Sequence, residues 1–309
     1  MNNLLFALRA LSPLHCGIGQ GLNDIDLPTA RHAVSGHPII PGSSLKGVLK
    51  DEFSRGRPKK DDEEEKKVHA LFGLDGDSKF ASAVSIGDAL LLALPVRSFF
   101  GTFGYLASPY TLHMLKNQLK RVIKEDILPE VPDIRDPKNE IFKAILTKES
   151  ALKTANSTQI LLEELDLSID TEQSEVADKW AELIAPFFFD DEGQRIFKKR
   201  FTIVDDNALN FLADTALPVD ARIAINYETG TVEGGALWYE ETVSPETLFT
   251  GIVTIDRSYN PEQSATADEL KEVMTGKGRI HCQIGGKATT GKGFVAIGFK
   301  DSKSLEGGN

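Results

Sequence analysis

The sequence predicts an α+β protein in which both ends of the chain contribute strands to one sheet. Apolar runs of strand length occupy 3–11 and 86–94, and 280–299 divides into two strand-like pieces around a glycine-rich loop. Apolar residues recur at helical spacing between these runs. At 309 residues the chain is near the size at which single cores stop growing, so we expect one elaborated domain with insertions.

The stretch PIIPGSSLKGVLKDEF predicts a loop that opens into the first helix. We expect Ser43 or Ser44 to be its N-cap, because a hydroxyl accepts a hydrogen bond from a free N–H of the first turn. The apolar face of this helix consists of Leu45, Val48, Leu49 and Phe53. Lys46 and Lys50 fall on the other face.

Two later segments are predicted to be insertions on the sheet. In 111–185, apolar residues at helical spacing alternate with proline-broken loops, which predicts a helical insertion. After a strand-like stretch at 200–204, Asp205 or Asp206 is a suitable cap for a short helix. Residues 221–240 have the pattern of a β-hairpin.

Composition indicates a soluble globular protein, with 41% hydrophobic and 26% charged residues. No apolar run of about 18 residues is present, and the start of the chain lacks a basic leader with a cleavage site, so we expect a cytoplasmic protein without a membrane partner. The pairs His15-Cys16 and His281-Cys282 do not predict a zinc site, because neighbours on a strand point to opposite faces.

Charge is distributed unevenly along the chain. The net charge of −11 argues against a nucleic-acid partner, yet 277–303 carries six Lys or Arg residues and one acid. Residues 1–50 carry four bases and two acids, whereas 205–246 carries nine acids and one base. If the two ends pair in space, they form a basic surface on an acidic protein, and such a surface can bind a polyanion locally.

The loop from Gly286 to Gly293 almost matches a phosphate-binding P-loop. Gly293 stands where that motif needs Ser or Thr, and a strand follows where it needs a helix, so the loop does not predict a nucleotidase. Gly285, Gly286 and Gly291 nevertheless allow close approach of the backbone to a ligand, with Lys287 and Lys292 supplying positive charge. An ordinary glycine-rich hairpin turn is the alternative.

Several motifs together resemble a known family. They are LHCGIG at 14–19, IPGSSLKG at 40–47, LPVRS at 94–98, EGGALWYEE at 233–241, and the glycine loop. In this order they resemble the RAMP superfamily, most closely the repeating backbone subunit of the type III-B, or Cmr, CRISPR effector complex. The resemblance implies a ferredoxin-like palm related to the RNA-recognition motif, with a helical lid insertion and a β-hairpin thumb.

The resemblance also implies a division of the chain and a set of partners. The palm would comprise 1–110 with 250–309, the lid 111–199 and the thumb 200–249. The partners would be CRISPR RNA, target RNA, other subunits of the complex and stacked copies of the same chain. Sequence reading would be left to guide–target pairing, while the protein grips backbone and shape.

Candidate RNA-binding residues follow from the motifs and from helix chemistry. Lys46, Ser43 and Ser44 lie in the first turn of a helix, where free N–H groups favour a phosphate. Arg97 follows an apolar strand and either meets the RNA backbone or forms a structural salt bridge. Gly285, Gly286, Lys287, Gly291 and Lys292 complete the set of candidates.

The loop after the first strand carries the candidate cleavage residue. RNA is cut by its own 2′-hydroxyl when that group is deprotonated and held in line with the phosphate. The resemblance assigns target cleavage to the aspartate in the setting IDLP, which is Asp26 here. It also implies a divalent metal, Mg²⁺ or Mn²⁺, near Asp26. Asp24 stays an alternative, and a turn-forming role for Asp26 stays open as well.

Three further residues are candidates for acid–base roles. His15 precedes the glycines and titrates near neutral pH, although a packed histidine at a strand end is the alternative. Glu233 and Glu240 flank the apolar stretch of the predicted hairpin, and one of them would reach the aspartate loop of a neighbouring copy. Two other functions remain open: an RNA-binding scaffold without activity, and a nuclease that processes CRISPR RNA.

Overall fold

The structure is a computed structural model that describes residues 1–19, 25–55, 63–74, 80–123, 128–134, 142–261 and 263–306. In this part of the chain twelve strands form one mixed sheet, and β10 (Val219–Ile225) and β11 (Val232–Glu241) form a separate hairpin. The strands of the sheet are β1 (Asn2–Ala10), β2 (Ile39–Ile40), β3 (Val84–Ile86), β4 (Ala89–Arg97), β5 (Phe103–Ala107), β6 (Lys143–Leu146), β7 (Gln159–Leu162), β8 (Leu165–Asp170), β9 (Phe201–Val204), β12 (Leu248–Ile255), β13 (Ile280–Gln283) and β14 (Phe294–Lys300). The predicted α+β class is confirmed.

Strand β1 lies in the middle of the half of the sheet that is built from the chain ends. The order there is β13-β14-β1-β12-β4, and β1 is antiparallel to both of its neighbours. Leu5 pairs with Lys300 on one side and with Ile252 on the other. The two ends of the chain therefore share a sheet, as the strand-like runs at 3–11 and 280–299 predict.

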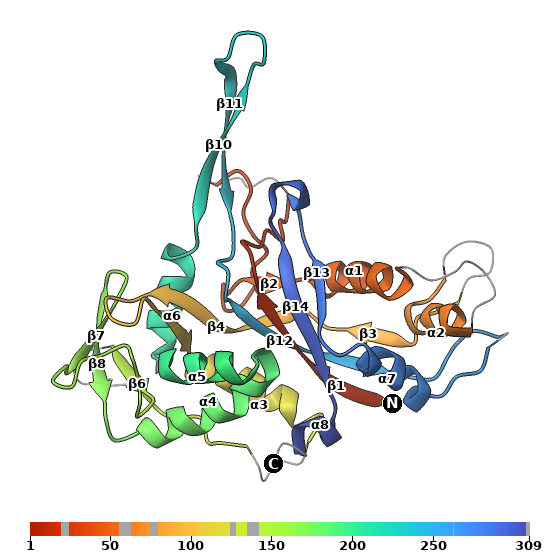
Figure 1. The fold of residues 1–309 in the computed structure, drawn as a ribbon, viewed down its shortest axis with the longest axis horizontal. Helices are drawn as coiled ribbons and strands as arrows, with labels where there is room; N and C mark the ends of the chain where they lie inside the picture. The colour runs from red at the N-terminus through yellow and green to blue at the C-terminus, as the bar shows by residue number, and fades with distance from the viewer. Residues whose placement is uncertain are drawn as a thin grey trace.

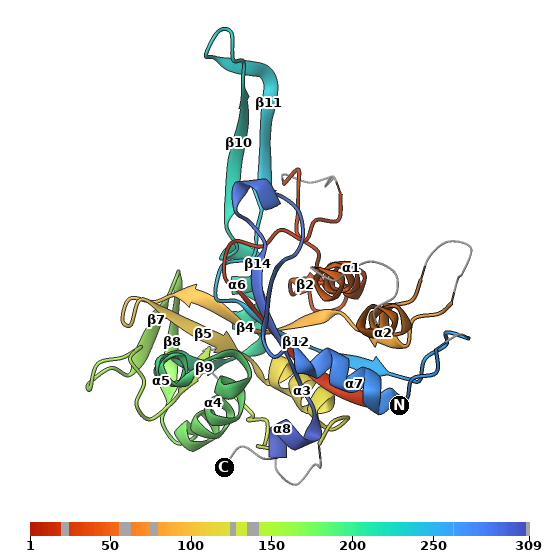
Figure 2. The same cartoon turned by 45° about the vertical axis from the view of Figure 1, so that its right-hand side comes forward.

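Helices cover both faces of the sheet (Figures 1 and 2). One face carries α1 (Gly42–Ser54), α2 (Glu63–Phe72), α6 (Asp206–Thr215) and α7 (Ala267–Gly276), and the other carries α3 (Pro109–Leu119), α4 (Ser174–Phe188) and α5 (Asp191–Arg200). Strand β1 contributes Phe6 to the first apolar cluster and Leu5 to the second, because successive side chains point to opposite faces. Two short helices, η2 (Ala288–Thr290) and α8 (Ser302–Glu306), complete the described fold. None of the described helices is long and apolar enough to cross a membrane.

The β10–β11 hairpin projects away from the helices and the sheet (Figures 1 and 2). Its turn is closed by two backbone hydrogen bonds, from Asn226 N to Thr231 O and from Gly230 N to Asn226 O. The hairpin predicted for 221–240 is thus confirmed. Its exposed apolar side chains are Val219, Ile223, Ile225, Tyr227, Val232, Leu237 and Tyr239.

The helical insertion predicted for 111–185 is only partly correct. Helices α3 and α4 lie there, but β6, β7 and β8 do too, and they extend the sheet beyond β9. These strands have only four to six residues, too few to interrupt the helical periodicity that surrounds them. The division into palm, lid and thumb stays a prediction.

Candidate functional site

The glycine loop and the segment after β1 are joined by backbone hydrogen bonds. Gly293 N donates to Pro13 O at 2.8 Å, and Gly286 N donates to His15 O at 2.9 Å. Leu11 N donates to Phe294 O at 2.8 Å, so the pairing continues directly from β14. The two basic ends of the chain therefore meet at one edge of the fold, above β1 and β14 (Figure 1).

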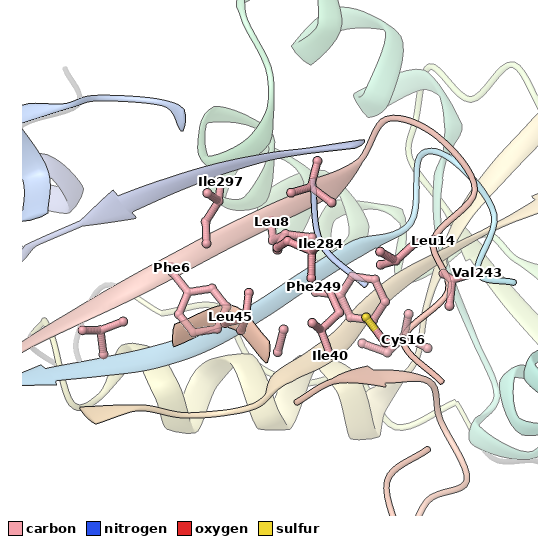
Figure 3. Close-up of a cluster of buried hydrophobic side chains, with 14 of the residues drawn as sticks. Phe6, Leu8, Leu14, Cys16, Ile40, Leu45, Val243, Phe249, Ile284 and Ile297 are labelled. Carbon is pink, nitrogen blue, oxygen red and sulfur yellow. The ribbon is translucent and has the colours of Figure 1, made fainter. Parts of the chain in front are cut away.

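Helix α1 begins close to these two segments. Leu45, from the first turn of α1, belongs to the same buried cluster as Cys16 and Ile284 (Figure 3). Each of these residues directly precedes a predicted site residue or glycine: Lys46, Gly17 and Gly285. The structure thus brings the start of α1, the loop after β1 and the glycine loop together.

The predicted cap of α1 is wrong. Pro41 is the N-cap residue, and the helix starts at Gly42, so Ser43 and Ser44 lie inside its first turn. Gly42 N donates to Asp88 Oδ1 at 2.8 Å, which satisfies one free N–H without a neighbouring hydroxyl. Ser43 is exposed and Ser44 and Lys46 are half-buried.

The glycine loop needs glycine at the point where it crosses the segment after β1. Gly285 has φ +83°, and a Cβ there would lie 2.3 Å from His15 O. Gly293 has φ +87°, and its Cβ would lie 2.2 Å from Ile284 O. Both positions combine left-handed backbone with backbone contact. A side chain at Gly285 would push the loop away from His15, and one at Gly293 would push it away from Ile284 at the other end of the same loop.

We expect Gly285→Ala to destabilise the protein, because the new methyl group meets a carbonyl that cannot rotate away. The loss should exceed about 1 kcal/mol. Gly286→Ala is a matched control: its Cβ would meet only ordinary contacts, the nearest 3.6 Å away. Urea unfolding of both variants measures the difference, and equal losses would contradict this account of the loop.

Lys292 and Lys287 of the glycine loop both point to Glu240 of β11. Lys292 Nζ lies 2.5 Å from Glu240 Oε1, and both side chains are buried, with 6% and 2% of their surface exposed. Lys287 Nζ lies 3.6 Å from Glu240 Oε2 and is partly exposed. Lys292 also lies 3.4 Å from Asp220 Oδ2. The loop is therefore tied to the base of the hairpin by a buried charge cluster.

Two opposing effects of its environment act on the pKa of Glu240. Burial, the largest single effect, raises the pKa of this carboxyl, but the hydrogen bond and charge of Lys292 together with the charges of Lys287 and His15 outweigh it. The pKa of Glu240 therefore lies below its ordinary value. A carboxylate held this way stays charged at neutral pH.

His15 is buried, and its ring orientation is set by the backbone. His15 Nδ1 lies 2.8 Å from Glu241 O, and a carbonyl only accepts, so Nδ1 carries the proton. Nε2 faces Gly17, where an added Cβ would lie 2.6 Å from it. His15 is thus packed at the strand end, with Nε2 as the nitrogen that can exchange a proton.

Asp26 is exposed and lies at the base of the hairpin. Tyr239 N donates to Asp26 Oδ2 at 2.8 Å. Next to it, Leu27 N donates to Tyr239 O at 3.0 Å, so this part of the loop runs beside β11. The alternative aspartate, Asp24, lies outside the described residues.

Arg97 and Glu233 lie apart from this group. Arg97 is the last residue of β4, and its guanidinium pairs with Glu163 at 3.0 Å. Strand β2, which leads into α1, pairs with the opposite end of β4, about 25 Å along the strand from Arg97. The structural salt bridge is thus present, and RNA contact by Arg97 stays a prediction. Glu233 lies in β11 near the hairpin tip, about 20 Å along the strand from Glu240.

The sequence motifs do not predict that Arg31 and Glu241 interact. The carboxylate of Glu241 accepts from Thr29 N at 3.0 Å and from Arg31 at 2.7 Å. Both residues were present in the motif region, since Arg31 follows the aspartate loop and Glu241 follows Glu240. Only the fold shows that they meet.

A divalent metal near Asp26 stays a prediction. Among the described residues, no group of three or more His, Cys, Asp or Glu side chains is placed to hold a metal ion. Asp26 accepts one backbone hydrogen bond through Oδ2. This fits Mg²⁺, which commonly takes one or two carboxylates and completes its shell with water and phosphate oxygens.

Comparison with known proteins identifies one family. A model of the RAMP superfamily matches residues 7–296. A Pyrococcus furiosus protein named CRISPR system Cmr endoribonuclease Cmr4 is 33% identical over 303 residues, covering 97% of each chain. A Saccharolobus solfataricus protein named CRISPR system CMR subunit Cmr4 is 25% identical over 316 residues, covering 94% of each.

Solved structures share the fold. Oligomeric Cmr4 from Pyrococcus furiosus matches with a TM-score of 0.73 and 27% identity, covering 97% of this chain and 99% of that one. A chain of the type III-B Cmr-beta complex bound to cognate target RNA matches with a TM-score of 0.72 and 20% identity, covering 97% of each chain. The second likeness concerns the fold alone.

Proposed function

The chain belongs to the RAMP superfamily, and from this premise we propose that it is a backbone subunit of a type III-B CRISPR effector complex. It binds CRISPR RNA, stacks with copies of itself and with other subunits, and cleaves the target RNA paired to the guide. The 33% identity to a relative named a Cmr endoribonuclease, over 97% of each chain, supports this function.

One observation carries the proposal of activity: the exposed carboxylate of Asp26 is held at the hairpin base. An acid on a nucleic-acid-binding surface repels phosphate, so its presence there needs a chemical reason. Its backbone partner, Tyr239 N, fixes one oxygen of the carboxylate. This arrangement suits a group that accepts a proton from a bound ribose.

The proposed reaction is attack by a target 2′-oxygen on the adjacent phosphorus. Asp26 takes the 2′-hydroxyl proton, the P–O2′ bond forms, and the P–O5′ bond breaks. The products are a 2′,3′-cyclic phosphate and a 5′-hydroxyl that has gained a proton. His15 is the candidate for delivering that proton from Nε2, which requires the imidazolium form of the ring with both nitrogens protonated.

A divalent metal, Mg²⁺ or Mn²⁺, belongs to the same proposal. Asp26 would hold it, together with phosphate oxygens of the RNA, and it would offset charge on the phosphate. Glu233 of a neighbouring copy stays a candidate for assistance. Glu240 is bound to Lys292 within its own chain, so we assign it to holding the glycine loop.

RNA binding is proposed to rest on the junction of α1 and the glycine loop. Ser43 and Ser44 lie in the first turn of α1, and Lys46 follows that turn. Their side chains are the proposed phosphate contacts, because most N–H groups of the turn already have partners, Asp88 for Gly42 N and Pro41 O for the N–H groups of Ser44 and Leu45. Lys287 presents a partly exposed ammonium group from the loop. The exposed apolar side chains of the hairpin suit contact with bases and need no positive charge.

Reconstitution with CRISPR RNA and the other subunits tests the function. We expect evenly spaced cuts in a complementary target RNA, one for each stacked copy, and loss of cutting when EDTA removes divalent metal. An intact target would favour the scaffold function instead. Cutting of repeat RNA by the isolated chain would favour CRISPR-RNA processing.

A further inference from the structure

Glu241 contacts both segments that carry the proposed acid–base groups. Its backbone O accepts from His15 Nδ1 at 2.8 Å, and its backbone N donates to Leu27 O at 3.0 Å. Its carboxylate accepts from Thr29 N at 3.0 Å through Oε2. Glu241 is therefore hydrogen-bonded to His15, which precedes Asp26 in the sequence, and to Leu27 and Thr29, which follow it.

Arg31 fixes the other oxygen of this carboxylate. Arg31 lies 2.7 Å from Glu241 Oε1, and only 4% of the Glu241 side chain is exposed. The same guanidinium donates to Gly36 O and Ala213 O and pairs with Asp214. With Arg31 held from three other directions, the Glu241 carboxylate has one orientation available, and that orientation aims Oε2 at Thr29 N.

We propose that Glu241 is a positioning residue of the cleavage site. Through its hydrogen bonds to Leu27 and Thr29, it fixes the position of Asp26 relative to the hairpin. This inference rests on the proposed function. Glu241 itself is buried, so the role assigned to it is to hold other residues of the site. Its adjacent residue Glu240 points to the glycine loop, so neighbouring carboxylates on one strand hold the two halves of the site.

Replacing the carboxylate by an amide tests the proposal. In Glu241→Gln the amide oxygen can serve Thr29 N or Arg31, but the NH₂ group then faces the other donor. The aspartate loop shifts, and small displacements of a reacting group cost up to about 100-fold in rate. We expect single-turnover target cleavage to fall about 10- to 100-fold, with target-RNA affinity kept within about threefold.

Amide hydrogen exchange of the complex supplies a readout that does not depend on cleavage. Exchange at Thr29 should become about fivefold faster in Glu241→Gln, because its acceptor is lost or shared. Glu241→Asp keeps the charge but withdraws the carboxylate, and it should show the same two effects. If Glu241→Gln does not assemble into the complex, Glu241→Asp is used for both measurements instead.

Glu246→Gln is the matched control, because it weakens the ion pair between Arg9 and Glu246. The N–O distance of that pair is similar to the 2.7 Å between Arg31 and Glu241, but within the described part of the chain the pair makes no hydrogen bond to the segment that carries Asp26. Arg9 NH2 lies 2.6 Å from Glu246 Oε1. Cleavage within about threefold of wild type in both Glu241 variants, or a loss no larger than in the control, overturns the proposal. A wild-type complex that does not cut overturns the proposed function instead, while unchanged exchange at Thr29 separately overturns the positioning.

Discussion

Replacing Asp26 by asparagine should nearly abolish cleavage of target RNA and leave RNA binding largely intact. Asparagine keeps an oxygen for the hydrogen bond from Tyr239 N but cannot take a proton from the 2′-hydroxyl. A single general acid or base contributes about 100- to 10,000-fold, so we expect a loss in this range in single-turnover assays of the complex. Affinity for target RNA should change by less than about threefold, because target binding rests mainly on pairing with the guide.

Two controls make this result specific. Asp166→Asn changes an exposed aspartate of β8 and should cleave like the wild type. Asp24→Asn separates the two aspartates of the loop, and we expect it to keep most of the activity. Wild-type cleavage by Asp26→Asn would remove the proposed mechanism and favour the scaffold function.

Replacing Lys292 by methionine should cause the largest loss of stability. The change leaves the carboxylate of Glu240 buried without its 2.5 Å partner. Breaking a buried ion pair costs about 3–5 kcal/mol. Urea unfolding at neutral pH measures the loss, and a change below about 1 kcal/mol would show that the pair is not effectively buried.

Lys287→Met is the matched control, since it removes a more exposed lysine from the same carboxylate. We expect it to cost less than about 1 kcal/mol. The double variant Glu240→Leu/Lys292→Met should recover much of the stability, because no buried charge remains.

The pH dependence of this pair has a definite sign. Because the pKa of Glu240 is lowered in the folded protein, its contribution is fully present above the unfolded value of about 4.3 and is lost as pH falls through the lower folded value. The stability difference between wild type and Lys292→Met should therefore narrow in acid, below about pH 4.

Local patterns predicted those features that depend on neighbouring residues. The sequence predicts Asp205 or Asp206 as the cap of the helix that follows β9. Asp205 is the N-cap of α6, and its side chain accepts a hydrogen bond from Asn207 N at 2.8 Å. The cap of α1 could not be found this way, since Gly42 N is satisfied by Asp88, 46 positions later. Lys292 was expected to face RNA, and its partner Glu240 lies 52 positions earlier, so its burial followed only from the fold.

The site was predictable in its parts and not in its connections. The motifs around Asp26, His15 and the glycine loop are recognisable in the sequence, and the strand-like chain ends indicate that they meet. The role of Glu241 depends on contacts 212 and 226 positions away, to Thr29 and His15. No periodicity or spacing reports such contacts.

The central place of β1 determines when the molecule becomes competent during its synthesis. Its partner in β14, Lys300, lies 295 positions after Leu5, so the residues between them must be synthesised before this pair can form. Closure of so long a loop makes this pairing a late event in folding. A chain that stops before β14 therefore lacks one of the two strands that flank β1.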